Sequence, residues 1–245
     1  RRAGLVTAAE KTEAPRQPVI TPSPEVTLVT EPLDDEGYVD FVAALNQKLG
    51  AGVPASENAA IPFLRVMGPC EGNVDTTNAI LRELGQPEWK PGDLEYRSAA
   101  EILRGRFNND DADAMKRLWE QQSAAETAPW MPADHPDMMA VLKQNDAALN
   151  AIVEAVKRPQ YYRPLVRPKP HSTLIDVLLP DIQESRDVAR QLRMRAMLRL
   201  GAGELDASKE DLLAMHRLAR HIARGGTLIE GLVGIAIESM TIASE

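Results

Sequence analysis

Arginine and tyrosine side chains provide the most distinctive candidate chemistry in this sequence. Two tyrosines and an arginine are consecutive in a proline-rich stretch near residue 160, and three later arginines recur at intervals of three or four. That spacing places the later arginines on one helix face. Guanidinium groups bind carboxylates and phosphates through paired hydrogen bonds, so an acidic partner, a polysaccharide or an anionic surface would suit them. The candidate binding residues are Tyr161, Tyr162, Arg163, Arg186, Arg190 and Arg193.

The same residues have a simpler interpretation, which we favour. Arginines on helix surfaces are usually solvated or pair with carboxylates, and the chain offers Asp187, Glu230 and Glu238 among others. The two tyrosines would then pin an extended connection to the helical body. Under this interpretation the residues hold the fold together and bind no external ligand.

Motifs for metal and cofactor chemistry are missing from the sequence. The four histidines, at positions 135, 171, 216 and 221, match neither H-E-x-x-H nor the Glu-x-x-His of di-iron bundles. The single cysteine, Cys70, can form neither an intrachain disulfide nor a thiolate metal cluster. The acidic stretch 109–120 fills part of a calcium-loop pattern, but Ala114 stands where the turn requires glycine. We therefore expect no metal and no cofactor.

A glycine pair near the C-terminus has the spacing found in one kind of nucleotide-binding loop. Gly226 and Gly231 have the spacing of the phosphate-binding loop G-x-x-x-x-G-K-[ST], but Leu232 and Val233 follow where Lys and Ser or Thr are needed. The lysine and hydroxyl contacts to phosphate and Mg²⁺ would be lost. The sequence therefore predicts no nucleotide binding.

Composition and charge restrict the function further. The net charge of −8 argues against a dedicated nucleic-acid binder, although residues 157–224 carry fourteen Lys or Arg against eight Asp or Glu. Hydrophobic residues make up 44% of the chain and aromatic residues only 4%, a mixture that favours helices over strands. We expect an all-α fold of stacked αα-hairpins or an irregular helical bundle.

The chain divides into an extension and a helical domain. Residues 1–33 contain five prolines and no aromatic residue, which predicts a tether or disordered extension. Residues 34–245 should form the helical domain, with a subdivision near 125–136. Four prolines in 159–170 predict an extended connection. The predicted helices are 34–50, 56–69, 74–85, 92–105, 111–125, 137–157, 174–179, 181–200, 208–224 and 228–242.

Two polar positions in these helices carry specific expectations. Asn145 interrupts the apolar stripe of the helix over 137–157, and an unpaired buried amide costs about 1 to 3 kcal/mol, so it should have a partner. Ser208 with Asp211 resembles a capping signature at the start of the helix over 208–224, and Pro62 should kink the helix over 56–69.

The last two helices are predicted to form a tight hairpin. Gly225 and Gly226 should end one helix in the left-handed conformation, and Thr227 with Glu230 forms a capping box for the next. The helix over 228–242 is too short and too charged to cross a bilayer, so we expect it to be mostly buried. One narrow line along this helix, which we call the seam, contains Glu230, Gly234 and Glu238. We expect another helix to pack closely there and arginines to pair with the two glutamates.

Three stretches of the chain resemble a known family. They are "GYVDFVAALNQKLGAGVPASENAAIPFLRVMGP", "KQNDAALNAIVEAVKRPQYYRPL" and "RAMLRLGAGELDASKEDLLAMHRLARHIARGGTLIEGLVGIAI". They are similar to an uncharacterised family of helical, exported proteins from planctomycete-type bacteria, a resemblance that implies no particular activity. The stretch around 200–212 is also weakly similar to tetratricopeptide-like hairpins, but it lacks their aromatic residues and their 34-residue spacing does not recur.

These observations favour a non-catalytic helical interaction or structural domain with a protein partner, in an exported, extracytoplasmic bacterial protein. A cytoplasmic location is the alternative. Two other functions stay open: a hydrolase-like enzyme with a cleft of carboxylates and His216 or His221, and a binder of an anionic polymer through Arg186, Arg190 and Arg193.

Overall fold

The computed structural model describes residues 21–69, 73–92, 94–104, 112–167 and 180–244. Within these ranges the regular structure is helical, and the only β-type pairings are two isolated bridges, Leu33 with Val39 and Asn58 with Gln160. The predicted all-α class is confirmed. Cys70, residues 109–111 of the calcium-like stretch and the predicted helix over 174–179 lie outside the described residues.

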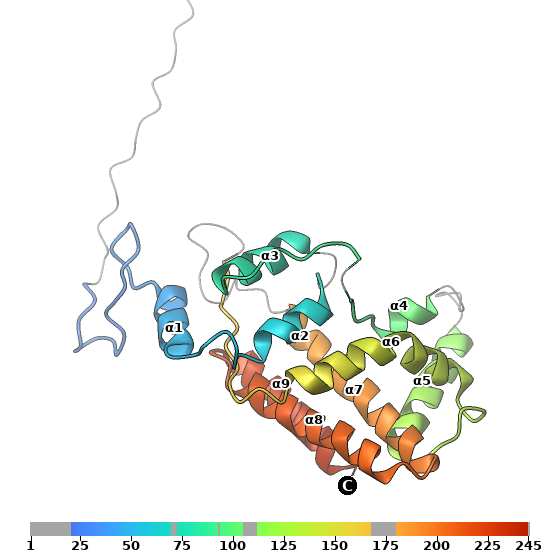
Figure 1. The fold of residues 1–245 in the computed structure, drawn as a ribbon. Coiled ribbons are helices and arrows are strands. Elements are labelled where there is room, and N and C mark those ends of the chain that lie inside the picture. Colours follow the sequence, from blue (N-terminus) through green and yellow to red (C-terminus); the bar gives the residue numbers. More distant parts are fainter. Residues whose placement is uncertain (1–20, 70–72, 93, 105–111, 168–179, 245) are drawn as a thin grey trace, which may run out of the picture.

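The helices of the described residues follow one another along the whole chain (Figure 1). They are α1 (Phe41–Gly50), α2 (Ala60–Met67), α3 (Val74–Glu83), α4 (Ala99–Leu103), α5 (Ala112–Thr127), α6 (Pro136–Ala155), α7 (Pro180–Gly201), α8 (Leu205–Ala223) and α9 (Leu228–Ile242).

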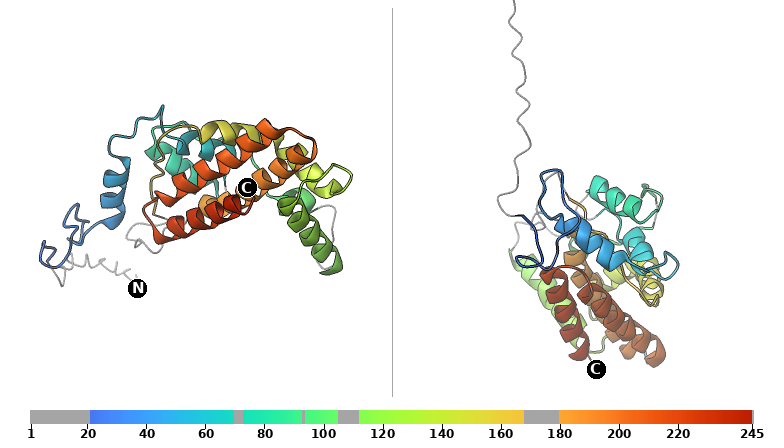
Figure 2. Two further views of the ribbon diagram at one scale, coloured as in Figure 1. Left: turned by 90° about the horizontal axis from the view of Figure 1, so that it is seen from below. Right: turned by 90° about the vertical axis from the view of Figure 1, so that its left-hand side faces the viewer.

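Helices α6, α7 and α8 form the centre of the molecule (Figures 1 and 2). Helix α7 packs against α5, α6, α8 and α9, while α6 also contacts α2 and α4. Large aliphatic side chains from all three central helices are fully buried and dominate the core: Leu149, Ile152, Leu192, Met194, Leu218 and Ile222. Short connections join α7 to α8 and α8 to α9, so each of these consecutive pairs packs as a helical hairpin.

Asn145 has the partners that its position in the α6 stripe requires. Its Oδ1 accepts a hydrogen bond from the Arg97 amide at 3.1 Å, and its Nδ2 donates to the Arg97 carbonyl at 2.6 Å and to Gln191 Oε1 at 2.8 Å. The amide is therefore satisfied although the residue is buried. It ties the segment before α4 to α6 and α7.

Two predicted helix starts are wrong, because both helices begin later in the chain than expected. Helix α1 starts at Phe41, not at residue 34, since Asp40 Oδ1 accepts the Ala43 amide at 2.8 Å and residues before it form a turn. Helix α2 starts at Ala60 rather than Ser56. Pro62 then lies in the first turn, where backbone amides have no partner within the helix, so the predicted kink is not needed.

Two further boundaries also differ from the expectation. Helix α4 covers only residues 99–103 because Ser98 and Glu101 form a capping box that begins it, and residues 94–97 are not helical. Helix α8 begins at Leu205, so Ser208 and Asp211 lie inside the helix and are buried there. The predicted cap at Ser208 is therefore wrong, and Asp211 has a different role.

The turn between α8 and α9 contains the predicted capping box, but its two glycines have a backbone conformation other than the one expected. Thr227 Oγ1 accepts the Glu230 amide at 3.2 Å, and Glu230 Oε2 accepts the Thr227 amide at 2.9 Å. Gly225 and Gly226 do not adopt the left-handed conformation. They are glycines because a Cβ at Gly225 would meet the Glu230 carboxylate, and one at Gly226 would lie 2.7 Å from Leu49 Cδ1.

Helix α9 is only half buried, which corrects the expectation of a mostly buried helix. Its inner face presents Glu230, Val233, Gly234, Ile237 and Thr241 to the bundle. Its outer face leaves large apolar side chains exposed, namely Leu228, Ile229, Leu232, Ile235 and Ile242. Glu238 forms no ion pair with a described arginine. Its Oε1 lies 3.0 Å from His216 Nδ1 instead.

The connection after α6 contains no helix in its described part, residues 158–167. Asn58 Oδ1 accepts the Tyr162 amide at 2.9 Å, and Asn58 Nδ2 donates to the Tyr162 carbonyl at 2.8 Å. Asn46 makes the same pair of bonds with Leu165, each 2.8 Å long. These four bonds strap the connection onto the α1–α2 region.

Candidate functional site

A groove of about 500 Å³ lies beside the central helices. We call it the α6–α7 groove. Its walls come from the α5–α6 connection, the first half of α6, the end of α7 and the turn into α8. Its lining residues are Met131, Pro132, Met139, Leu142, Lys143, Asp146, Arg195, Leu198, Arg199, Ala202 and Glu204. The volume falls within the range of natural ligand sites.

The outer wall of the groove is held in place by Trp130. This side chain is buried, its Nε1 donates to the Met194 carbonyl at 3.1 Å, and its ring meets the edge of His135 at 5.5 Å. Gly201 permits the approach, because a Cβ there would collide with the Trp130 carbonyl. Met131, the next residue, is left half exposed at the mouth of the groove.

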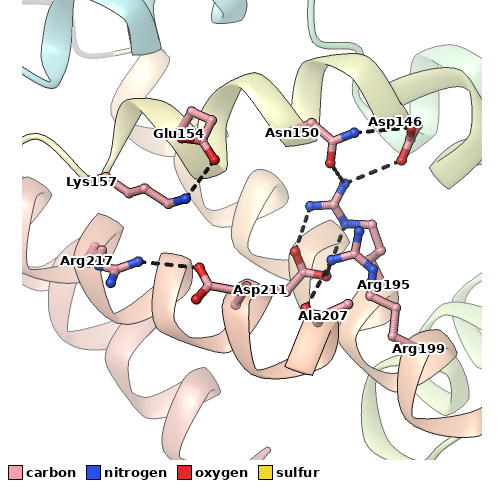
Figure 3. A network of polar contacts seen from close by, with 10 residues as sticks. Asp146, Asn150, Glu154, Lys157, Arg195, Arg199, Ala207, Asp211 and Arg217 are labelled. Atoms are coloured by element: carbon pink, nitrogen blue, oxygen red, sulfur yellow. Dashed lines mark hydrogen bonds and ion pairs between the residues drawn. The ribbon is translucent and has the colours of Figure 1, made fainter. Parts of the chain in front are cut away.

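A buried carboxylate fixes the arginines on the floor (Figure 3). Asp211 is fully buried, and its Oδ2 and Oδ1 accept hydrogen bonds from Arg195 Nε at 3.1 Å and Nη2 at 2.6 Å. Arg199 Nη1 donates to Asp211 Oδ2 at 2.6 Å and to the Ala207 carbonyl at 3.1 Å. This bidentate and shared pairing orients both guanidinium groups before any ligand arrives.

Helix α6 completes the coordination of Arg195. Its Nη1 donates to Asn150 Oδ1 at 2.8 Å and lies 3.5 Å from Asp146 Oδ1, while Asn150 Nδ2 bonds Asp146 Oδ2 at 3.2 Å. All three guanidinium nitrogens of Arg195 are therefore engaged. The ionic network links α6, α7 and α8 through a single side chain.

The charges at the groove are unevenly neutralised. Burial raises the pKa of the Asp211 carboxyl, and the hydrogen bonds and charges of Arg195 and Arg199 reduce that rise without cancelling it. Lys143 and Glu204 line the groove and form no ion pair with a described side chain. The groove thus combines apolar walls, two fixed guanidinium groups and one unpaired group of each sign.

The predicted tyrosines and Arg163 lie in the strap that follows α6. The Tyr161 ring stacks on His221 with centroids 5.6 Å apart, and a Cβ on Gly50 would lie 2.8 Å from the Tyr162 ring. Arg163 is buried. Their positions fit the interpretation in which they pin the connection to the helical body.

The three arginines of α7 lie elsewhere, so the six candidates do not form one site. Arg186 is exposed, and Arg190 lines a small cavity against α5. Arg193 Nη1 lies 4.0 Å from Glu126 Oε2, and its Nη2 is 3.4 Å from the Ala243 carbonyl. Burial raises the pKa of Glu126, against the opposing charges of Arg190 and Arg193. Their contacts are with α5 and α9, whereas the strap contacts α1, α2 and α8.

Of the two candidate histidines, His216 contacts one carboxylate, that of Glu238 at 3.0 Å. The cavity that contains His216 and the one that contains His221 have no carboxylate in their lining. Among the described residues no group of three or more His, Cys, Asp or Glu side chains could hold a metal ion. The described helices also include none that is long and apolar enough to span a membrane.

Sequence reasoning missed the residues of the ionic network. Asp211 was assigned to a cap, and Arg195, Arg199, Asp146 and Asn150 were not singled out. A usable signal exists, since the two arginines and the two α6 residues are each four apart and share a helix face. A scan against protein-family models found no match to this chain, and neither did searches of curated proteins and of solved structures.

Proposed function

We propose that the chain is a non-catalytic helical interaction domain of an exported or envelope-associated bacterial protein, and that it binds a short segment of a partner protein in the α6–α7 groove. The observation that carries the proposal is the groove itself. Its apolar wall is open to solvent, and its charged floor is already ordered by Asp211.

The lining indicates the chemistry of the bound segment. Met131, Met139 and Leu198 offer flexible apolar contacts, and methionine adapts readily to different partner side chains. Lys143 is unpaired among the described residues and stands on the same rim. A partner segment should therefore place an apolar side chain in the groove and a carboxylate beside Lys143. Pre-ordered arginines reduce the entropy that binding must offset.

Peptide display tests this function. A random peptide library selected on the wild-type chain should enrich sequences with an apolar residue next to Asp or Glu. Selection on the Lys143→Glu variant should instead enrich Lys or Arg at that position. Lys116→Glu is the matched control, because Lys116 is exposed on α5 outside the groove, and it should leave the acidic preference unchanged.

Failure has two recognisable forms. No enrichment on the folded wild-type chain would reject the groove as a peptide site, and so would the same enriched sequences on wild type and Lys143→Glu. The non-catalytic part of the proposal is tested separately with a broad hydrolase panel. Turnover that disappears when carboxylates such as Asp146 are changed would favour the enzyme alternative.

A further inference from the structure

A second cavity, at the C-terminal ends of α6 and α8, concentrates positive charge. It measures about 200 Å³ and lies where the ends of α6 and α8 meet. We call it the α6–α8 basic pocket. Its lining is Val156, Lys157, Arg158, Pro159, Arg217, Arg220, His221 and Arg224. Five of these side chains are cationic and none is acidic.

Few described groups neutralise this charge. Lys157 Nζ pairs with Glu154 at 2.7 Å, but the two side chains are 43% and 70% exposed to water, so the pair is weak. Arg158 Nη1 donates to the carbonyls of Ala55 and Asn58, each at 3.1 Å, which leaves its charge uncompensated. The other three arginines of the lining, Arg217, Arg220 and Arg224, are neutralised even less by described carboxylates.

Arg217, Arg220 and Arg224 share one face of α8, at intervals of three and four. Glu210 Oε2 lies 4.0 Å from Arg217 Nη1, which is beyond hydrogen-bond distance. That nitrogen is buried and has no hydrogen-bond partner. Arg220 and Arg224 pair with no described carboxylate. Three guanidinium groups therefore retain unused donors at the pocket.

His221 provides a buried polar group in the same lining. The residue is only 5% exposed, its Nε2 lies 3.1 Å from the Val156 carbonyl, and its Nδ1 is buried without a hydrogen-bond partner. A polar atom without a partner in a buried position is rare in folded proteins. Because Nε2 donates to the Val156 carbonyl, the neutral ring leaves Nδ1 as an acceptor, so His221 forms part of the cavity wall and the arginines supply the donors.

Helix dipoles alone do not account for the cluster. Basic side chains are favourable at helix C-termini, and both α6 and α8 end here. Each helix end, however, contributes the equivalent of about half a negative charge. Two helix ends therefore offset roughly one of the five cations, and the rest repel one another.

We propose that the α6–α8 basic pocket binds a compact oxyanion with two negative charges, either inorganic phosphate or the phosphoryl group of a small phosphate monoester. Guanidinium forks match phosphate oxygens in pairs, and the unused donors of Arg217, Arg220 and Arg224 are available for them. The cavity is smaller than the roughly 300 to 1,000 Å³ typical of sites for larger molecules, so only a small group fits inside. This inference is independent of the groove.

Calorimetric titration of the intact chain tests the proposal. Sodium phosphate at pH 7.5, with ionic strength held constant by NaCl, should give saturable one-to-one binding, and sodium nitrate should give none. The paired substitution of Arg220→Gln with Arg224→Gln should weaken phosphate binding about tenfold or more, by the usual contribution of charged hydrogen bonds. Arg186→Gln with Arg190→Gln removes the same charge from α7 and should leave the affinity unchanged.

Four results would overturn the site. They are the absence of saturable phosphate binding by the wild-type chain, equal affinity in the paired pocket variant, an equal loss in the α7 control, and equally tight binding of dimethyl phosphate, a monoanion. Glycerol 3-phosphate distinguishes the two sources: binding at least as tight as that of phosphate identifies a monoester ligand, and weaker binding identifies the free ion. The wild-type titration decides the question even if the paired variant fails to fold.

Discussion

Single buried polar residues determine how the central helices of this molecule meet. Asn145 was expected to have a partner because an unpaired buried amide is costly, and the structure supplies Arg97 and Gln191. Its partners could not be predicted, since they belong to segments distant in sequence. Asp211 was misassigned because Ser208 and Asp211 match a capping pattern locally. Its real partners, Arg195 and Arg199, depend on how α7 packs against α8.

The first prediction concerns Asp211. Asp211→Asn keeps the size of the side chain and removes the charge that compensates two arginines, so the free energy of unfolding should fall by about 3 to 5 kcal/mol. Asp146→Asn is the matched control. Asp146 also contacts Arg195 but is 61% exposed, and its substitution should cost less than about 1 kcal/mol. Urea denaturation measures both, and similar losses in the two variants would contradict the role given to Asp211.

The second prediction concerns pH. Burial lowers the pKa of His221 below its ordinary 6.5, assisted by the charges of Arg224 and Arg220. The unfolded chain therefore takes up a proton at higher pH than the native chain does. The stability that the neutral form contributes is complete above pH 6.5 and is lost as the pH falls from 6.5 toward the native pKa.

Thermal denaturation of His221→Gln between pH 7.5 and 5.5 measures this term. The variant should lose less stability on acidification than the wild-type chain, by about 1.4 kcal/mol for each pH unit that separates the native and unfolded pKa values. Titration of other groups is common to both proteins and cancels in the difference. Parallel pH profiles would show that His221 titrates alike in the folded and unfolded chain.

At the scale of elements, one helix cap was predicted correctly, and the surroundings of the helices were not predictable. The box of Thr227 and Glu230 depends on residues three apart, so the sequence alone predicted the start of α9. The starts of α1 and α8 were missed because acidic residues near them resembled a helix N-terminus. The exposure of the outer face of α9 was also missed, because an apolar run does not reveal how many neighbours a helix has.

The third prediction uses the two interior glycines of α9. A closely packed helix was expected at Gly234, and a Cβ there would lie 2.6 Å from Ala223 Cβ and 2.7 Å from the Ala219 carbonyl oxygen. Gly234→Ala should therefore destabilise the protein by about 1 to 3 kcal/mol through overpacking. Gly231 has nothing within 4 Å of such a Cβ, and Gly231→Ala should stabilise by up to about 1 kcal/mol. Urea denaturation should show a lower free energy of unfolding for Gly234→Ala and a higher one for Gly231→Ala. Changes of the same sign in both variants would contradict this packing.

At the scale of the whole molecule, α1 stands at one end of the helical body and has few attachments to it (Figures 1 and 2). Val42 is the only residue of α1 that is buried. The helix is held by Asn46, which bonds Leu165, and by the ion pair of Asp40 with Arg167. The composition of the chain predicted the helices, but this division between a packed centre and a tethered end depends on long-range contacts that no local pattern specifies.

The fourth prediction follows from that division. Burial alone would raise the pKa of Asp40, but Arg167 and the Ala43 amide outweigh it and hold the pKa below its ordinary 3.8. The attachment is therefore complete at neutral pH and is lost as the pH falls through that lowered pKa. Asp40→Asn removes the ion pair and keeps a side chain that caps helices well, so α1 should remain helical.

Native-state hydrogen exchange distinguishes local from global opening. In Asp40→Asn the amides of residues 41–50 should exchange about fivefold faster, which corresponds to a partly exposed ion pair worth about 1 kcal/mol, while α6 and α8 keep their rates. Glu154→Gln, which breaks an exposed pair with Lys157 on α6, should leave α1 unaffected. If the amides of all helices exchanged faster by the same factor in Asp40→Asn, α1 would open only when the whole molecule unfolds. The ion pair would then stabilise the entire domain instead of one end.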